Sequence, residues 1–459
     1  MKARLLRGGR LLGRSEVLRS SAVAAVIRAV GLAVVFLLQI LLARLAADAT
    51  TYGVYAWGQN LLFLLGTLFA LGIPMMASRL AAVHVHRGDY TALRQLSRNA
   101  HGCVIVISCA GAGAGLLIVW SLPAALFTEL PRAVVSLALL ASPLLALILL
   151  RQALARAASR LFSAFVPIQV LRPLLTGLLA LGAFLLVQRP LTALDILTAL
   201  ALSLLLVLLA QLLWEGARPP LVSAAAGSTE PAVDPAITAD TTGDNRDTTP
   251  GAADLLRQSM PVFATRVADI VMTYGNTLLL GLIGGPLAAA SFFVADRLAQ
   301  LAGMPGAVTS AVIQPWLASA HAEGDRARLQ RVVTQAAHVS LWPSVVAAAL
   351  LFTAGPWLLA LFGGEFAAAL PVLVALLLAQ LCAVLFGHCQ QVLVMSGHQQ
   401  QVMRLTVLAA ALHLLVLAVL IPVLGALGAA LASIASSLLL ATGCWWLVRR
   451  QYHLRTTVF

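Results

Sequence analysis

The sequence has few charged residues. Only 10% of its 459 residues are Asp, Glu, Lys or Arg, whereas 61% are hydrophobic, and the mean hydropathy is +0.94. Soluble domains carry about 25% charged and about 45–50% apolar residues, so this chain cannot cover its surface with polar groups in water. The shortage of charge excludes soluble enzymes, soluble nucleic-acid-binding proteins and secreted disulfide-rich domains, and it indicates an all-α integral membrane protein.

Acidic residues and lysine are scarce as well. The chain has 17 Asp and Glu against 30 basic residues, a net charge of +13, and Lys2 is its one lysine. The arginines lie between apolar runs and not in a cluster interleaved with aromatic residues. The basic excess therefore predicts membrane topology and not a nucleic-acid partner.

Cysteine is rare, and no two cysteines form a C-x-x-C pair. We interpret all five as small buried residues with free thiols. The spacing of Cys and His fits no zinc site, so the sequence predicts neither a metal nor a cofactor. The five positions are Cys103, Cys109, Cys382, Cys389 and Cys444.

Twelve apolar runs are long enough to cross a bilayer, which takes about 20 residues per helix. With a cytoplasmic N-terminus, 23 basic residues fall on the inner side, four fall within spans, and Arg44, Arg132 and Arg189 fall outside. This asymmetry obeys the positive-inside rule, so both termini are predicted to be cytoplasmic. The run 287–317 exceeds one straight span, and we expect a kink at Met304-Pro305. The expected spans are 22–47, 55–78, 101–122, 133–150, 163–187, 192–213, 259–283, 287–317, 332–354, 368–388, 402–421 and 425–448.

The chain is predicted to have five segments, and a long polar stretch lies at its middle. Residues 215–256 are rich in Pro, Thr and acidic groups, a composition that cannot bury a core, so we expect a disordered cytoplasmic linker. It separates a first six-helix bundle, 22–214, from a second, 257–448. A basic segment, 1–21, precedes the bundles and is expected to lie on anionic lipid headgroups. A basic cytoplasmic tail, 449–459, follows them.

The two bundles resemble each other at a shift of about 238 residues. Ser21 and Arg28 correspond to Ser259 and Arg266, and the motif Tyr52-Gly53-Val54-Tyr55 corresponds to Ala290-Ser291-Phe292-Phe293. The loops Gly88-Asp89 and Gly324-Asp325 also match, as do Leu126-Phe127 and Leu361-Phe362. Six spans per copy is an even number, so the repeats are parallel and related by an axis along the membrane normal.

Ionisable residues within the spans are the candidate site residues. A charge at the bilayer centre costs roughly 2.5–3.5 kcal/mol on insertion scales, so each needs a partner or a water-filled cavity. Arg266 and Asp269 are three residues apart and can pair, whereas Arg28 has Gly31 at the corresponding place. An anionic ligand would explain this unpaired Arg28. The candidates are Arg28, Arg172, Arg266 and Arg297, with Asp269 and Asp296 for salt bridging or ion coupling.

Other interpretations of these residues stay open. The arginines can instead be structural, paired with Asp or helix carbonyls, and Arg172-Pro173 can mark a kink. Asp296 and Arg297 are neighbours and point about 100° apart, so at most one needs to face a cleft. The polar residues His388, Gln390, Gln391 and His413 are interpreted as packing or loop residues.

These features resemble the multidrug/oligosaccharidyl-lipid/polysaccharide exporter superfamily, and within it the polysaccharide-biosynthesis branch of lipid-linked oligosaccharide flippases. The resemblance rests on twelve spans in two parallel repeats, Leu42-Ala43-Arg44, Tyr52-Gly53-Val54-Tyr55 and the paired Gly-Asp loops. It implies a MATE-like fold. It also implies transport of an undecaprenyl-pyrophosphate-linked oligosaccharide between the leaflets of the bacterial inner membrane, with coupling to H⁺ or Na⁺ and with polymerase or glycosyltransferase partners left open.

The resemblance implies that Arg28, Arg266 and Arg297, with Arg172, contact the pyrophosphate in a cationic cleft of one monomeric unit. Arginine suits this role because it offers paired donors to phosphate oxygens. Two alternatives within the superfamily are a multidrug cation antiporter, which would need a more acidic cavity, and a lipid II flippase. An enzyme is not expected, because the outer loops are short and carry few acidic residues.

Overall fold

The computed structural model describes residues 26–27, 29–158, 160–216, 252–322 and 326–452. These ranges are almost entirely helical, and one parallel bridge, between Ala46 and Leu191, is the β pairing found in them. The predicted basic segment 1–21 and most of the predicted linker lie outside the described residues.

In the described residues up to Gly216, the first half has eight helices, a five-residue π-helical turn, Pro167–Leu171, and a 3-10 turn, Ala124–Phe127. The helices are Ala29–Leu45, α2 (Ala49–Phe69), α3 (Ile73–Arg87), α4 (Tyr90–Ser121), α5 (Arg132–Ala157), α6 (Leu161–Val166), α7 (Arg172–Val187) and α8 (Ala193–Gly216).

Over residues 252–322 and 326–452, the second half has seven helices, with a π-helical turn, Leu280–Gly284, and a 3-10 turn, Gly364–Ala369. The helices are α10 (Ala252–Leu279), α11 (Gly285–Ala322), α12 (Arg326–Phe362), α13 (Leu370–Leu385), α14 (Cys389–Met395), α15 (Gln399–Leu424) and α16 (Ala426–Tyr452).

The predicted membrane fold is confirmed over the described ranges. Nine helical stretches are long and apolar enough to cross a bilayer, and the bent pair α2–α3 is a tenth. The helix Ala29–Leu45 is apolar but shorter than these stretches. One of the nine stretches, Arg266–Gln314, contains parts of both α10 and α11, and Gly285, with a φ of +82°, lies where α11 begins. Each of the twelve expected spans therefore corresponds to a helix or to a broken helix.

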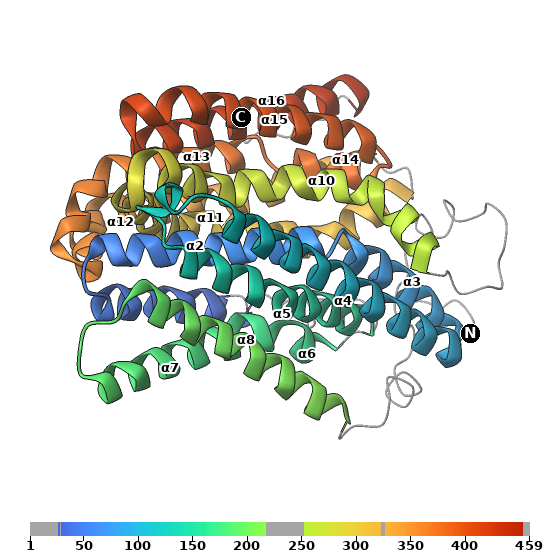
Figure 1. Cartoon of the computed structure of the whole chain (residues 1–459). Helices are drawn as coiled ribbons and strands as arrows, with labels where there is room; N and C mark the ends of the chain where they lie inside the picture. The colour runs from blue at the N-terminus through green and yellow to red at the C-terminus, as the bar shows by residue number, and fades with distance from the viewer. Residues whose placement is uncertain (1–25, 28, 159, 217–251, 323–325, 453–459) are drawn as a thin grey trace, which may run out of the picture.

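The two halves lie against each other, the blue-to-green half below and the yellow-to-red half above in Figure 1. Helices α2, α10 and α11 lie where they meet, since α2 contacts both of the others. The repeat-related segments of α2 and α11 are central to this contact: the rings of Tyr52 and Phe293 lie 6.1 Å apart, and both side chains are buried.

Several helices are interrupted inside the bundle. Leu71 and Gly72 have positive φ and separate α2 from α3, which are bent by 49°. Gly387, with a φ of +69°, separates α13 from α14. Helix α11 continues through Pro305 as one element, so the kink expected there stays a prediction.

Some local expectations are corrected and others are confirmed. Helices α8 and α10 extend into the two ends of the predicted linker, because Gly216 and Ala252 are helical. None of the five cysteines forms a disulfide, but only Cys389 and Cys444 are buried; Cys103 and Cys382 are half-buried and Cys109 is exposed, so the expectation that all five are buried is wrong for these three. The exposed position lies on α4, where an apolar thiol can face lipid.

Candidate binding cavity between the two halves

The halves touch closely on the side of the loops predicted to be outside. We call this the outer contact layer, and it is apolar and aromatic. The ring of Tyr52 lies 6.0 Å from that of Phe366, and the ring of Phe36 lies 5.7 Å from that of Phe362. Edge-on aromatic pairs of this kind add about 0.5–1.5 kcal/mol to the gain from burial, so the layer closes this side of the molecule.

Backbone and arginine contacts tighten the same layer. A Cβ atom on Gly53 would lie 2.0 Å from the carbonyl oxygen of Pro286, so only glycine permits α2 to approach α11 this closely. Arg44 donates from Nε to the carbonyl of Leu361 over 2.7 Å and from Nη2 to that of Ala360 over 2.8 Å. Arg44 thereby supplies donors to two carbonyls in the last turn of α12 in the opposite half, where the carbonyl of Ala360 also accepts from the backbone N–H of Gly363.

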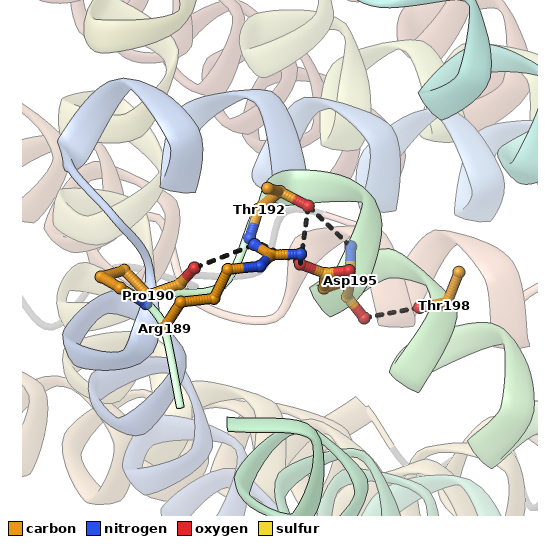
Figure 2. Close-up of polar contacts among 5 residues, drawn as sticks. All are labelled: Arg189, Pro190, Thr192, Asp195 and Thr198. Atoms are coloured by element: carbon orange, nitrogen blue, oxygen red, sulfur yellow. Dashed lines mark hydrogen bonds and ion pairs between the residues drawn. The ribbon is translucent and has the colours of Figure 1, made fainter. Parts of the chain in front are cut away.

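The other two outer arginines stay within the first half. Arg132 donates to the carbonyl of Leu122, and its guanidinium lies over the ring of Phe127. Arg189 pairs with Asp195 over 3.2 Å, and Asp195 also accepts from the backbone N–H of Thr192, which completes a capping box at the start of α8 (Figure 2). All three outer arginines therefore have local structural partners.

A cavity of about 450 Å³ lies on the inner side of the outer contact layer. Some helices contribute residues both to the outer contact layer and to the cavity. In each of these helices, the residues that line the cavity lie closer to the inner side than the residues of the layer. On α2, for example, Phe63 and Thr67 line the cavity, whereas Tyr52 and Gly53 form the layer. Both halves contribute to what we call the central cavity. Its polar and charged lining residues are Thr67, Gln169, Arg172, Tyr274, Arg297 and Gln300.

Gln169 in the π-helical turn and Arg172, the first residue of α7, line the central cavity. Single π-helical turns inside α-helices are rare and occur frequently at functional sites. The helix Ala29–Leu45 packs directly on this turn, because a Cβ on Gly31 would lie 2.9 Å from the Cβ of Gln169. Arg172 donates to the carbonyl of Ile168 over 3.2 Å, and its guanidinium lies 4.9 Å from the centre of the Phe63 ring.

Arg297 approaches the central cavity from α11 in the second half. Its Nη1 donates to Gln300 Oε1 over 3.1 Å, and Gln300 Nε2 donates to Asp296 Oδ2 over 2.6 Å. Gln300 therefore bridges the acid and the base. The Nε atom of Arg297 is buried and has no hydrogen-bond partner within the described chain, so the contacts of Arg297 within the protein do not use all of its donors.

The charge in the central cavity is positive. Two guanidinium groups line it, one from each half, and no Asp or Glu is among its lining residues in the described chain. No described carboxylate forms a salt bridge with Arg172, whose charge is stabilised by the Phe63 ring and a helix carbonyl. Both arginines are half-buried, and a charge withdrawn from water without a counter-charge is costly, so this arrangement is suited to an anionic ligand.

The remaining candidate residues lie elsewhere or outside the described ranges. Arg28 is not among the described residues. Arg266 Nη1 lies 3.9 Å from Asp269 Oδ2, as their spacing predicted, but both side chains are about half exposed and neither lines the central cavity. They lie one to two turns of α10 toward the inner side from Tyr274, which does line it.

Sequence reasoning missed the neutral polar residues of the central cavity. Gln169, Tyr274 and Gln300 carry no charge, and only their position inside apolar runs distinguishes them. It also missed a buried network in the first half, in which Tyr52 donates to Gln39 over 3.0 Å and Tyr55 donates to Gln59. The sequence carried one signal for such residues, which is a polar residue three or four positions from a charged one in the same helix. Gln300 has this spacing from Arg297 and Asp296.

No protein-family model matches the sequence, and no curated protein matches it. Solved structures match its fold. A multidrug resistance MATE family transporter of the MOP superfamily in an inward-facing conformation superposes with a TM-score of 0.73 at 13% identity, covering 94% of this chain and 98% of that one.

Two further structures resemble the fold. The lipid II flippase MurJ in an inward closed conformation gives a TM-score of 0.67 at 12% identity, covering 93% of this chain and 87% of that one. An outward-facing MATE family transporter gives 0.58 at 13% identity, with 95% and 96% covered. The structural neighbours are therefore MATE and MOP superfamily transporters, and the MATE-like fold predicted for the chain is confirmed.

Proposed function

We propose that the chain is a transporter, not an enzyme, and that it moves a polyprenyl-pyrophosphate-linked oligosaccharide from the inner to the outer leaflet. The observation that carries this proposal is the pair Arg172 and Arg297, one from each half, in a central cavity whose lining has no carboxylate. A pyrophosphate between them would supply the missing negative charge. The polyprenyl tail would remain in the lipid, so only the headgroup needs to enter.

Alternating access is the mechanism that this geometry favours. The outer contact layer seals one side, and the central cavity lies on the other, as expected for an inward-facing state. The higher TM-score with the inward-facing than with the outward-facing MATE transporter supports this assignment. A ligand that bridges both halves would stabilise one relative orientation of them, and rocking about the layer would then expose the site to the opposite side.

A lipid II flippase is the second candidate. Its substrate is also a lipid-linked pyrophosphate, and the TM-score of 0.67 with MurJ favours it. A multidrug cation antiporter is disfavoured, because two arginines would repel a cationic drug in the central cavity. The two flippase candidates share the anion site and differ in the sugar unit of the substrate.

The test uses a strain that lacks the gene, from which lipid-linked oligosaccharides are extracted. Loss of transport should cause a pyrophosphate-linked sugar unit to accumulate, and the wild-type chain should clear it. A hydrogen bond to a charged group contributes about 1.5–3 kcal/mol, so Arg172→Ala or Arg297→Ala should each weaken binding by roughly 10- to 150-fold and leave the lipid uncleared.

Arg189→Ala and Arg266→Ala are the matched controls. Arg189 lies in the outer capping box and should clear the lipid as wild type does. Arg266 is half exposed and already paired, so its loss should have a smaller effect than that of Arg172. Clearance by both cavity variants would overturn the cationic site, and accumulation of lipid II would favour the second candidate.

A further inference from the structure

A second cavity, of about 260 Å³, lies wholly within the second half. We call it the C-terminal cavity. It is enclosed by α10, α11, the break between α13 and α14, and α16. Its polar lining is neutral apart from one imidazole. The polar lining residues are Ser310, Gln380, His388, Gln390, Gln391 and Ser437, together with the thiols of Cys389 and Cys444.

His388 occupies the break in the helix. It follows Gly387, whose φ of +69° ends the α13 segment, and it precedes α14. The residue is only 5% exposed. Its Nδ1 lies 3.0 Å from Ser310 Oγ on α11, and Gln391 Nε2 donates to the same hydroxyl over 3.3 Å. The backbone of Ala336 on α12 also interacts with the ring.

The second nitrogen of His388 has no partner in hydrogen-bonding geometry. Nε2 is buried, and the described residues offer it no hydrogen bond. If Nδ1 carries the proton and donates to Ser310, Nε2 is a bare acceptor. If Ser310 donates to Nδ1, Nε2 carries an N–H, and the backbone of Ala336 is the further group that interacts with the ring. The first tautomer leaves a buried acceptor unmet, which costs about 1–3 kcal/mol, and a proton on Nε2 would satisfy it.

Imidazole is the group in the C-terminal cavity suited to titrate near neutral pH. The other titratable lining groups are the thiols of Cys389 on α14 and Cys444 on α16. No Asp, Glu, Lys or Arg from α10, α11, α13, α14 or α16 lines this cavity in the described chain. A proton gained by His388 would therefore meet no fixed charge there.

Helix α11 connects His388 to the central cavity. Ala307 lines both cavities, and Ser310 is less than one turn away from it. On the same helix Arg297 and Gln300 line the central cavity. At Gly303 α11 packs directly on α13, since a Cβ there would lie 2.6 Å from Gln380 Oε1. A change at the His388–Ser310 contact would thus move the helix that carries half of the anion site.

We propose that His388, held by Ser310, is a proton-binding site that couples protons to the inward–outward transition. The coupling to transport rests on the proposed function, whereas the effect of pH on conformation does not. In the arrangement described here the ring is buried among neutral groups, and burial disfavours an ionised side chain. Low pH should therefore destabilise this arrangement and populate one in which the outer contact layer is open.

The test measures hydrogen–deuterium exchange of the purified full-length chain in liposomes, without substrate, between pH 5.5 and 8. Rates are corrected for the intrinsic effect of pH. In the wild-type chain, exchange in peptides of the outer contact layer should rise by about fivefold or more on acidification. His388→Gln should abolish this rise, and Ser310→Ala should shift its midpoint.

His413→Gln is the matched control. His413 is also buried, with Nδ1 3.1 Å from Ser436 Oγ and Nε2 unpartnered, but it lines neither cavity. Its variant should keep the wild-type pH response. A pH response that survives in both His388→Gln and Ser310→Ala, or that disappears in His413→Gln, would overturn the assignment.

A second measurement separates this inference from the proposed function. Transport of undecaprenyl pyrophosphate into the opposite leaflet is followed in the same liposomes, with and without an imposed pH gradient. Acceleration by the gradient in wild type, lost in His388→Gln, supports coupling. A pH-dependent conformation without any transport of this lipid would support the proton site and contradict the proposed substrate.

Discussion

The two halves share the order of their helices but interrupt different ones. In the first half the second span is bent between α2 and α3, and the fifth contains the π-helical turn. In the second half the corresponding helices α11 and α15 are continuous, a π-helical turn lies between α10 and α11, and a break lies between α13 and α14. Each interruption next to a cavity carries polar residues: Gln169 and Arg172 in the first half, His388 in the second. The two repeats thus share their helix order and differ in the interruptions that place polar residues beside the cavities.

The arginines of the central cavity also differ between the two repeats. At the repeat shift, Arg172 corresponds to the apolar run 407–410, and Arg297 corresponds to Gln59, which belongs to the buried network of the first half. The two guanidinium groups therefore come from positions that are not equivalent. The site is asymmetric even though the scaffold is a repeat, and single substitutions can test each half separately.

The largest expected effect comes from the close approach of α2 to α11. Gly53→Val would place side-chain atoms where the carbonyl of Pro286 now lies. Overpacking costs about 1–3 kcal/mol, and here the obstacle is backbone, so the upper part of that range or more is expected. Thermal unfolding of the purified chain in detergent measures the loss.

Gly113→Val is the control for this substitution. Gly113 lies on α4, is exposed, and would have nothing within 4 Å of an added Cβ. Equal losses of stability in the two variants would show that the α2–α11 approach is not special. The corresponding residue of the second half, Ser291, already carries a side chain, so the requirement for glycine is confined to one repeat.

A smaller effect is expected when the arginine that joins the halves is removed. Arg44→Ala deletes two charge-assisted hydrogen bonds to α12, which at an exposed site contribute on the order of 1–2 kcal/mol together. Because they exist only while the outer contact layer is closed, the outward state should gain roughly tenfold in population. Spin-label distances across the outer loops measure this population. The same shift in Arg189→Ala, whose contacts stay within the first half, would contradict the explanation.

The smallest expected loss of stability comes from removing the N-cap of α2, which its repeat-related helix α11 lacks. Asp48 caps α2 by accepting from the backbone N–H of Thr51 over 2.6 Å, whereas α11 begins with Gly285-Pro286 and has no such cap. Removing an acidic N-cap costs about 1 kcal/mol. Denaturant unfolding at pH 7 should therefore show Asp48→Ala to be less stable than wild type by about that amount.

The effect of Asp48 should depend on pH in a defined direction. The backbone hydrogen bond from Thr51 lowers the pKa of Asp48 below its ordinary value of 3.8. A depressed pKa means that the stabilisation is fully present above the unfolded value and is lost as the pH falls through the folded value. The difference between Asp48→Ala and wild type should therefore shrink below about pH 3.8. A difference that persists there would assign it to packing.

The sequence predicted the spans because apolar runs and the placement of arginine are long-range averages that survive local irregularity. It also brought Arg172 and Arg297 forward, since a charge inside an apolar run is conspicuous. It could not indicate that Arg266 lies away from the central cavity, because helical rotation relative to the other half depends on packing. Nor could the sequence indicate that His388 lines a cavity, since a glycine before it, Gly387, is equally typical of an ordinary loop.

Helix α11 also has a mechanical consequence. Its 38 residues form one continuous helix, about 57 Å along its axis at 1.5 Å per residue. If it pivots at its outer end, where α2 holds it, a tilt of about 10° carries the inner end through about 10 Å over that length. A lever of this length turns a small displacement beside Pro286 into a wide aperture at the far end, without melting any helix.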